Sequence, residues 1–147
     1  MRDGLDSTNY VRGEDEYYHF ILLAKDEIGH QQIRQLSTRA WKRSWMNGRM
    51  RRVPTYYQDL KDIIGTNPGH VIGSTACIGG YLPKLILKDK PQQMMAEWLH
   101  EMVDIFGKDD FYLELQPSDN KEQLKVNNYL LKISKGTGIK YIITTFR

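Results

Sequence analysis

The residue in this sequence best suited to metal chemistry is its only cysteine, Cys77. It lies in the segment Ser74-Thr75-Ala76-Cys77-Ile78-Gly79-Gly80, directly after the apolar run His70-Val71-Ile72-Gly73. This pattern predicts a strand that ends in a loop, a position that often carries binding and catalytic side chains. A thiol there could ligate a metal, but free cysteine is also among the most frequently buried residue types. The residues alone leave metal ligation and inert packing both open.

A second candidate for binding is the basic segment between residues 39 and 52. It contains six cations, no acidic residue and two interleaved tryptophans: Arg39, Lys42, Arg43, Arg49, Arg51 and Arg52, with Trp41 and Trp45. Cations can contact nucleic-acid phosphates while aromatic rings stack on bases, so the segment is a candidate surface for single strands. A solvated face, or a surface that docks against the rest of a larger protein, fits the same pattern.

The two glycines after Cys77 raise the possibility of a phosphate-binding loop. The sequence contains neither the GxGxxG pattern nor the lysine and hydroxyl residue of a P-loop. A tight turn into the next helix is the simpler interpretation of Gly79 and Gly80.

The composition is that of one ordinary domain. The 147 residues suffice for a single core, and one cysteine excludes an intramolecular disulfide framework. A formal charge of +3 and a pI near 8.9 are only mildly basic. No apolar run approaches the roughly 20 residues of a membrane span, and the N-terminus has no apolar signal-peptide region. We therefore expect a cytoplasmic protein with no membrane partner.

Hydrophobic periodicity predicts that strands and helices alternate. Residues 17–24 are apolar on both parities, which predicts a strand buried on both faces, with His19 on the face of Ile21 and Leu23. Further strands are expected at Val71, at 111–116 and at 141–144, and helices after Asp26, near Tyr56, at Tyr81, after Pro91 and around Leu124. This order predicts an α/β fold of right-handed βαβ units around a mainly parallel sheet or barrel, with functional groups at the carboxyl ends of its strands.

The two ends of the chain differ in character. Residues 1–16 are polar and charged, which predicts a flexible N-terminal segment ahead of a domain over residues 17–147. The last predicted strand stops almost at Arg147, without the helix or loop that should follow. We therefore expect the chain to be part of a longer protein.

Three segments resemble the polymerase and histidinol phosphatase (PHP) domain in the family's order and approximate spacing. They are residues 19–29 (HFILLAKDEIG), 74–80 (STACIGG) and 111–116 (FYLELQ). The form they resemble stands at the amino terminus of the replicative DNA polymerase III alpha subunit of bacteria and phages. The resemblance covers most of residues 17–144, and it implies a partial, distorted (β/α) barrel with a metal cluster at one end.

His19 and Cys77 match metal-ligand positions of this family, the second of which is a histidine or cysteine in relatives. Without the resemblance, His19 would be interpreted as a hydrogen-bonded core residue. The resemblance implies a divalent metal in the intact domain, which could be zinc, manganese or magnesium. Imidazole and thiolate suit zinc or similar transition metals, which can generate a hydroxide nucleophile.

The sequence also departs from the family pattern. The opening His-x-His strand, the following Asp-His segment and a glutamate on a further strand would all lie before Met1. Phe146 stands about where relatives carry the aspartate of a closing Asp-x-His pair. Structural zinc takes four protein ligands and catalytic zinc three, so we expect this chain alone to bind metal weakly or not at all and to be inactive.

The resemblance implies part of the PHP domain of a DNA-directed DNA polymerase, a nucleotidyltransferase. In the intact polymerase the domain would be structural or would act as a metal-dependent 3′–5′ exonuclease or phosphoesterase. Its partners would be the remainder of the polymerase chain, DNA and other replication proteins. Two alternatives stay open: a free-standing phosphoesterase, and a small single-stranded nucleic-acid-binding module that uses Trp41, Trp45 and the cations of residues 39–52. Missing barrel strands would expose sheet edges, which predicts aggregation or marginal stability.

Overall fold

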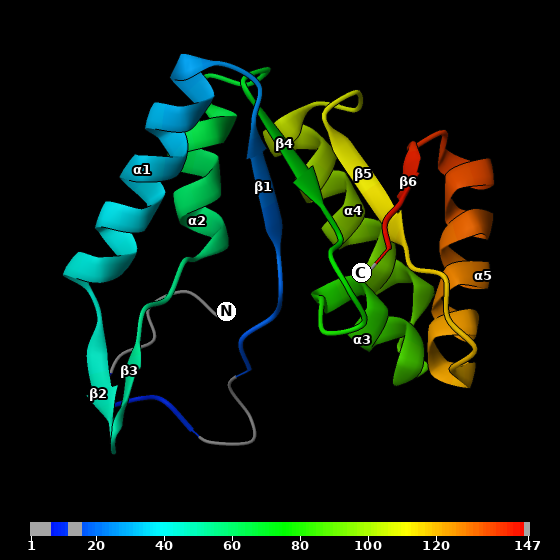
Figure 1. The fold of residues 1–147 in the computed structure, drawn as a ribbon, viewed down its shortest axis with the longest axis horizontal. Helices are drawn as coiled ribbons and strands as arrows, with labels where there is room; N and C mark the ends of the chain where they lie inside the picture. Colours follow the sequence, from blue (N-terminus) through cyan, green and yellow to red (C-terminus); the bar gives the residue numbers. More distant parts are fainter. Residues whose placement is uncertain (1–6, 12–15, 146–147) are drawn as a thin grey trace.

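A four-stranded sheet forms the centre of the fold in the computed structural model, which describes residues 7–11 and 16–145 (Figure 1). Its strand order is β1-β4-β5-β6, where the strands are β1 (Ile21–Ala24), β4 (Val71–Ser74), β5 (Phe111–Leu115) and β6 (Tyr141–Ile143). The pairs β4–β5 and β5–β6 are parallel, whereas β1 runs antiparallel to β4. The predicted α/β fold with mainly parallel strands is thereby confirmed.

The helices follow the predicted order. They are α1 (Glu27–Lys42), α2 (Tyr57–Leu60) with a π-helical continuation (Lys61–Gly65), α3 (Tyr81–Leu87), α4 (Gln92–Phe106) and α5 (Lys121–Thr137). Asp26 caps α1 as predicted, because its side chain accepts a hydrogen bond from the backbone N–H of Gly29. Asn120 caps α5 in the same way, and Gly138 ends that helix in the left-handed conformation.

A short hairpin lies beyond the end of α1. Its strands, β2 (Trp45–Asn47) and β3 (Met50–Arg52), pair antiparallel around the turn predicted at Asn47-Gly48. Gly48 has a φ of +61°, a conformation that glycine adopts without steric cost. The short sequences of β2 and β3 show no apolar periodicity, so the sequence indicated the turn but not the strands.

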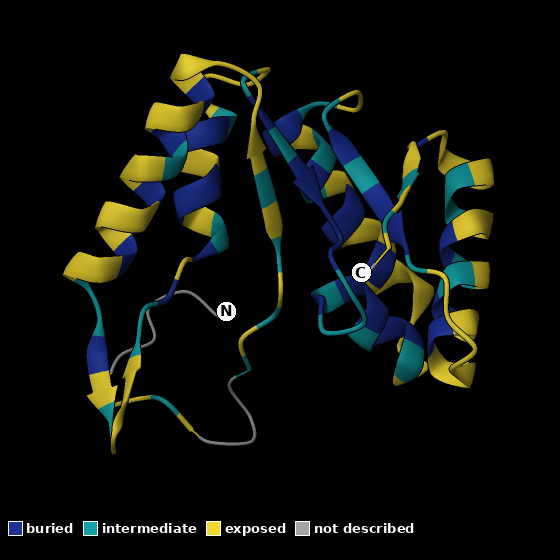
Figure 2. Cartoon of the chain, in the orientation of Figure 1, coloured by how far each residue is buried: buried dark blue, intermediate teal, exposed yellow. Residues whose placement is uncertain are grey.

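The main core lies between the sheet and α4, which presents the apolar stripe that its periodicity predicted (Figures 1 and 2). The rings of Phe106 and Phe111 stack with centroids 6.0 Å apart, and Phe20 stacks on Phe106 at 5.8 Å. Gly73 allows this packing, because a Cβ there would lie only 2.8 Å from the Phe106 ring.

The prediction of a strand over residues 17–24 buried on both faces is wrong. The strand covers only Ile21–Ala24, and it is an edge strand within the described part of the chain. Only one parity, Phe20 and Leu22, packs against the core, whereas Ile21 and Leu23 are 37% and 54% exposed. Alternate residues of a strand lie on opposite faces of the sheet, but the sequence of the strand does not show whether another element covers each face. The burial of both faces could therefore not be predicted from the sequence.

Several expectations fall partly outside the described residues. The predicted flexible segment 1–16 includes residues 1–6 and 12–15, which lie outside the described residues. Phe146, which stands where relatives carry an aspartate, also lies outside them. The domain boundary at residue 17 therefore stays a prediction. In the part of the chain that is described, no helix combines the length and apolar character needed to cross a membrane.

Candidate metal centre

His19 and Cys77 lie in contact although 58 residues separate them in sequence. The Nδ1 atom of His19 is 3.0 Å from the Sγ atom of Cys77. Cys77 follows the carboxyl end of β4, and His19 stands shortly before β1, the antiparallel neighbour of β4. The fold thus brings together the two residues that the sequence identified as candidate ligands.

Backbone hydrogen bonding fixes His19 beside the Cys77 loop. The N–H of His19 donates to the carbonyl of Gly79 over 3.1 Å, and His19 forms an isolated parallel bridge with Gly80. A Cβ at Gly80 would overlap the carbonyl oxygen of Thr75, and one at Gly79 would lie 3.1 Å from His19 Nδ1. These glycines therefore permit close approach of the backbone and of the imidazole, in addition to the predicted turn.

The backbone of the loop that carries Cys77 also contacts its sulfur atom. The N–H of Gly79 lies 3.4 Å from Cys77 Sγ and donates to it, while Ala76 adopts a φ of +56°, which is uncommon outside glycine. The Ala76 N–H is held by Ser74 Oγ at 3.2 Å. Strained backbone of this kind is concentrated at functional sites, so the geometry favours a role for Cys77 beyond packing.

The two donors fit a transition metal by chemistry and position. His19 is exposed and Cys77 is half-buried, so both can be reached from solvent. A tetrahedral zinc ion bonded to one nitrogen and one sulfur would hold them roughly 3.5 Å apart, given bond lengths of about 2.0 and 2.3 Å. The observed 3.0 Å is a hydrogen-bonding distance, so the two atoms would move about 0.5 Å apart to bind the ion. Hard cations such as Mg²⁺ prefer oxygen ligands, so this pair suits zinc better.

Two ligands are nevertheless fewer than a closed zinc site requires. Among residues 7–11 and 16–145, no cluster of three or more histidine, cysteine, aspartate or glutamate side chains could hold a metal ion. Further ligands would have to come from water or from groups outside these residues.

Glu114 on β5 forms a buried polar network beside this site. Its side chain is buried and accepts hydrogen bonds from Ser74 Oγ at 2.9 Å, Thr144 Oγ1 at 2.7 Å and Gln116 Nε2 at 3.1 Å. Its backbone N–H donates to Thr75 Oγ1 at 2.9 Å. Neutral donors thus link the carboxyl ends of β4, β5 and β6 through one carboxylate.

Among the described residues, Glu114 has no basic partner. The sequence signal was a glutamate between two leucines in an apolar strand. That pattern identifies an unusual carboxylate, but not the hydroxyl groups from β4 and the end of β6 that surround it.

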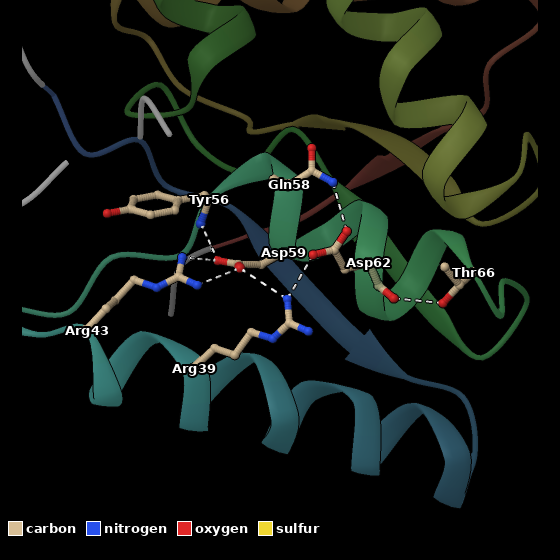
Figure 3. Close-up of polar contacts among 7 residues, drawn as sticks. All are labelled: Arg39, Arg43, Tyr56, Gln58, Asp59, Asp62 and Thr66. Atoms are coloured by element: carbon tan, nitrogen blue, oxygen red, sulfur yellow. Dashed lines mark hydrogen bonds and ion pairs between the residues drawn. The ribbon is translucent and has the colours of Figure 1, made fainter. Parts of the chain in front are cut away.

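Two of the six predicted nucleic-acid contacts are used inside the fold. Arg43 forms two hydrogen bonds to Asp59, at 2.7 and 2.9 Å, and lies over the Tyr56 ring at 4.4 Å (Figure 3). Arg39 lies 2.9 Å from Asp62 and 3.6 Å from Asp59. The hydrogen bond to Asp62 is the main cause that raises the pKa of Arg39. The basic segment contains no acidic residue, but Asp59 of α2 and Asp62 of its π-helical continuation lie beside it in the fold.

The other cations lie toward the hairpin. Lys42, Arg49 and Arg51 are exposed, and so is Trp41 at 58%. Arg51 donates to Ser44 Oγ over 3.0 Å. These side chains remain accessible to an anionic partner.

Arg52 and Trp45 instead pack into a small aromatic cluster. The Arg52 guanidinium lies 5.3 Å from the Tyr17 ring centre and 5.6 Å from that of Tyr10. Trp45 is buried, with its ring 6.2 Å from that of Tyr10. Partial burial raises the pKa of Tyr17 to about 12, against the opposite effect of Arg52. Trp45 therefore cannot stack on a base in this conformation.

The fold and the site together define an α/β domain whose candidate residues gather where strands meet their loops. The chain belongs to the PHP domain family, whose sequence model matches residues 4–118. This result confirms the resemblance found from the three segments. Domains of this family generally depend on a metal.

The chain is also homologous to DNA polymerases. It is 37% identical to the probable DNA polymerase YorL of Bacillus subtilis and to a DNA-directed DNA polymerase of Bacillus phage SPbeta, over 93% of this chain and 12% of each relative. It is 35% identical to the DNA polymerase III subunit alpha of Borreliella burgdorferi, over 90% of this chain and 11% of that protein. The chain thus spans about 10–12% of the length of the relatives it matches.

Proposed function

We propose that this chain forms part of the PHP domain of a replicative DNA polymerase, and that His19 and Cys77 are two ligands of its metal centre. The 3.0 Å contact between His19 Nδ1 and Cys77 Sγ carries the proposal. The homologous DNA polymerase III alpha subunits support the replicative setting. In that setting the domain over residues 17–147 would join the remainder of a polymerase chain, DNA and replication proteins in the cytoplasm.

The two side chains have distinct tasks in this centre. Cys77 would bind as a thiolate, which the N–H of Gly79 stabilises by donating to the sulfur. The imidazole of His19 would bind through Nδ1, because the backbone bond to Gly79 already directs that atom toward the sulfur. When bound, the metal would supply either a structural cross-link or a hydroxide for phosphodiester hydrolysis.

The structural role follows directly from this donor pair. In the sequence, His19 precedes β1 and Cys77 follows β4, with α1 and α2 between them. A shared metal would therefore hold the residues before β1 against the loop after β4. A 3′–5′ exonuclease or phosphoesterase would need additional ligands and a substrate position. We therefore propose hydrolysis only for an intact polymerase that supplies them.

Zinc-dependent stability tests this proposal. At a zinc concentration ten times the dissociation constant, binding to the folded chain alone would stabilise it by about 1.4 kcal/mol. At zinc concentrations high enough to occupy a weak site with two protein ligands, we expect the wild-type Tm to rise, and Cys77→Ser and His19→Ala to abolish the rise. His100→Ala, which removes an exposed histidine on α4, is the matched control. Equal zinc responses in all four proteins would contradict the assignment.

The basic segment supports a second candidate, contact with single-stranded nucleic acid. The exposure of Lys42, Arg49, Arg51 and Trp41 favours it, whereas Arg39 and Arg43 are engaged with acidic residues. A labelled oligothymidylate should bind with an affinity that falls as salt rises. Replacing Arg49 and Arg51 by glutamate should abolish binding, whereas replacing Lys121 and Lys135 on α5 by glutamate should not. No detectable binding at low salt would exclude this function.

A further inference from the structure

The groove between α4 and α5 is an apolar surface with room for another polypeptide. Both helices pack against α3, but they make little contact with each other, which leaves a groove of about 620 Å³. Buried Met95, Leu99 and Ile139 line it, together with half-buried Val103 and Ile133. Grooves of this kind accept the apolar face of a third helix, because helices pack with their axes only about 8–10 Å apart.

The charged side chains that line this groove are lysines. His100, Lys108 and Lys132 line it, and no aspartate or glutamate does. His100 pairs with Asp104 along α4, at 3.0 Å. Lys108 and Lys132 have no ion-pair partner among the residues that the structure describes, so two lysines beside an apolar surface are available to an anionic partner.

Neighbouring lysines behave differently. Lys125, also on α5, lies 2.8 Å from Asp89, and Lys140 lies 2.9 Å from Asp109. Lys108 and Lys132 differ from these two lysines in having no ion pair, and they lie at the groove, where partner carboxylates would meet them. This charge pattern selects the occupant: an apolar surface alone would accept any hydrophobic segment, but the lysines favour acidic flanks.

We propose that the α4–α5 groove binds an amphipathic helical segment of a partner protein, whose apolar side chains enter the groove and whose carboxylates pair with Lys108 and Lys132. This binding site shares no residue with the His19–Cys77 pair. It therefore adds a protein-recognition function that does not depend on metal binding.

Two designed peptides provide the test. Each has 16 residues and leucines on one helical face, and its polar face carries either glutamates or lysines. The full chain should bind the glutamate peptide at least tenfold more tightly than the lysine peptide, measured by fluorescence anisotropy at moderate salt. Equal affinities, or no binding of either peptide at millimolar concentration, would overturn the proposal.

Charge reversal locates the contact. Lys108→Glu with Lys132→Glu should weaken the glutamate peptide about tenfold and strengthen the lysine peptide. Lys121→Glu with Lys135→Glu changes the net charge equally on exposed positions outside the groove and should leave both affinities nearly unchanged. Ala96→Trp, at an exposed groove position, should block both peptides. Equal effects of the two double variants would show only a general charge effect and would overturn the assignment.

Discussion

Arg43 and Asp59 form a two-point ion pair that fastens the end of α1 to the first turn of α2. Its nitrogen–oxygen distances are 2.7 and 2.9 Å, and the Asp59 side chain is only 4% exposed. The same carboxylate accepts a hydrogen bond from the N–H of Tyr56 over 2.9 Å. A cation that the sequence offered as a nucleic-acid contact is thus part of the fold.

Loss of Arg43 should destabilise the chain. Arg43→Met keeps an apolar stem but leaves the buried carboxylate with weaker compensation from Arg39, so we expect a loss of about 2 kcal/mol in the free energy of unfolding. The matched control is Arg34→Met, whose ion pair with Glu27 is exposed on both sides and 3.8 Å long, and we expect less than about 0.5 kcal/mol there. Urea unfolding measures both losses. Equal values would show that the pair with Asp59 adds nothing specific.

Two helical glycines should respond oppositely to alanine. A Cβ at Gly29 would overlap the carbonyl of His70, so Gly29→Ala should cost about 3 kcal/mol or prevent folding. A Cβ at Gly136 meets nothing within 4 Å, so Gly136→Ala should stabilise α5 by about 0.5–1 kcal/mol. Circular dichroism during thermal unfolding would show the two shifts. A tolerated Gly29→Ala would contradict the close approach of α1 to the start of β4.

The cap of α1 should make stability depend on pH in the acid range. Hydrogen bonds from His70 and then from the N–H of Gly29 hold the pKa of Asp26 below its ordinary value of 3.8. A lowered carboxyl pKa stabilises the folded state fully above the unfolded-state pKa, and this contribution is lost as pH falls through the folded-state pKa. The contribution of Asp26 should therefore be complete above about pH 4 and should disappear below it.

Asp26→Asn isolates this charge because asparagine is also a good helix cap. Its Tm should fall less steeply than that of the wild type when the pH drops from about 4 to 2. Asp119→Asn, which removes an exposed carboxylate in the loop before α5, should retain the wild-type slope. Parallel profiles for all three proteins would show that Asp26 has no such effect.

The carboxylate of Glu114 should matter chiefly through its hydrogen bonds. Glu114→Ala leaves the donors Ser74, Gln116 and Thr144 without this acceptor in a buried place, which should cost about 3 kcal/mol. Glu114→Gln keeps one carbonyl oxygen and should cost only about 1 kcal/mol. Chemical denaturation separates the two variants. A glutamine variant as unstable as the alanine variant would mean that the negative charge, rather than the hydrogen bonding, is required.

The sequence predicted elements whose side chains repeat over several turns. The apolar residues from Met94 to Phe106 predicted α4, because they repeat at three- and four-residue intervals along that stretch. The short strands β2 and β3 gave no such signal. The exposure of Leu23 depends on which elements cover that face of the sheet. The alternation of apolar and polar residues within one strand gives no information about this.

The candidate site could be predicted only by resemblance. His19 and Cys77 are 58 residues apart, so no local metal motif relates them, and their contact depends on the pairing of β1 with β4. The ion pair of Arg43 could not be predicted either, because its partner Asp59 lies on the next helix. Tertiary contacts of this kind follow from the fold and not from the spacing of residues along one element.

Cobalt spectroscopy is the most direct test of whether His19 and Cys77 bind one metal ion. Co²⁺ can substitute for zinc, and a cobalt–thiolate bond gives a charge-transfer absorption that a cobalt–imidazole bond does not. With excess Co²⁺, we expect this absorption in the wild type, its loss in Cys77→Ser and a marked weakening of cobalt affinity in His19→Ala. No thiolate absorption in the wild type, or a cobalt affinity unchanged by His19→Ala, would contradict a shared metal centre.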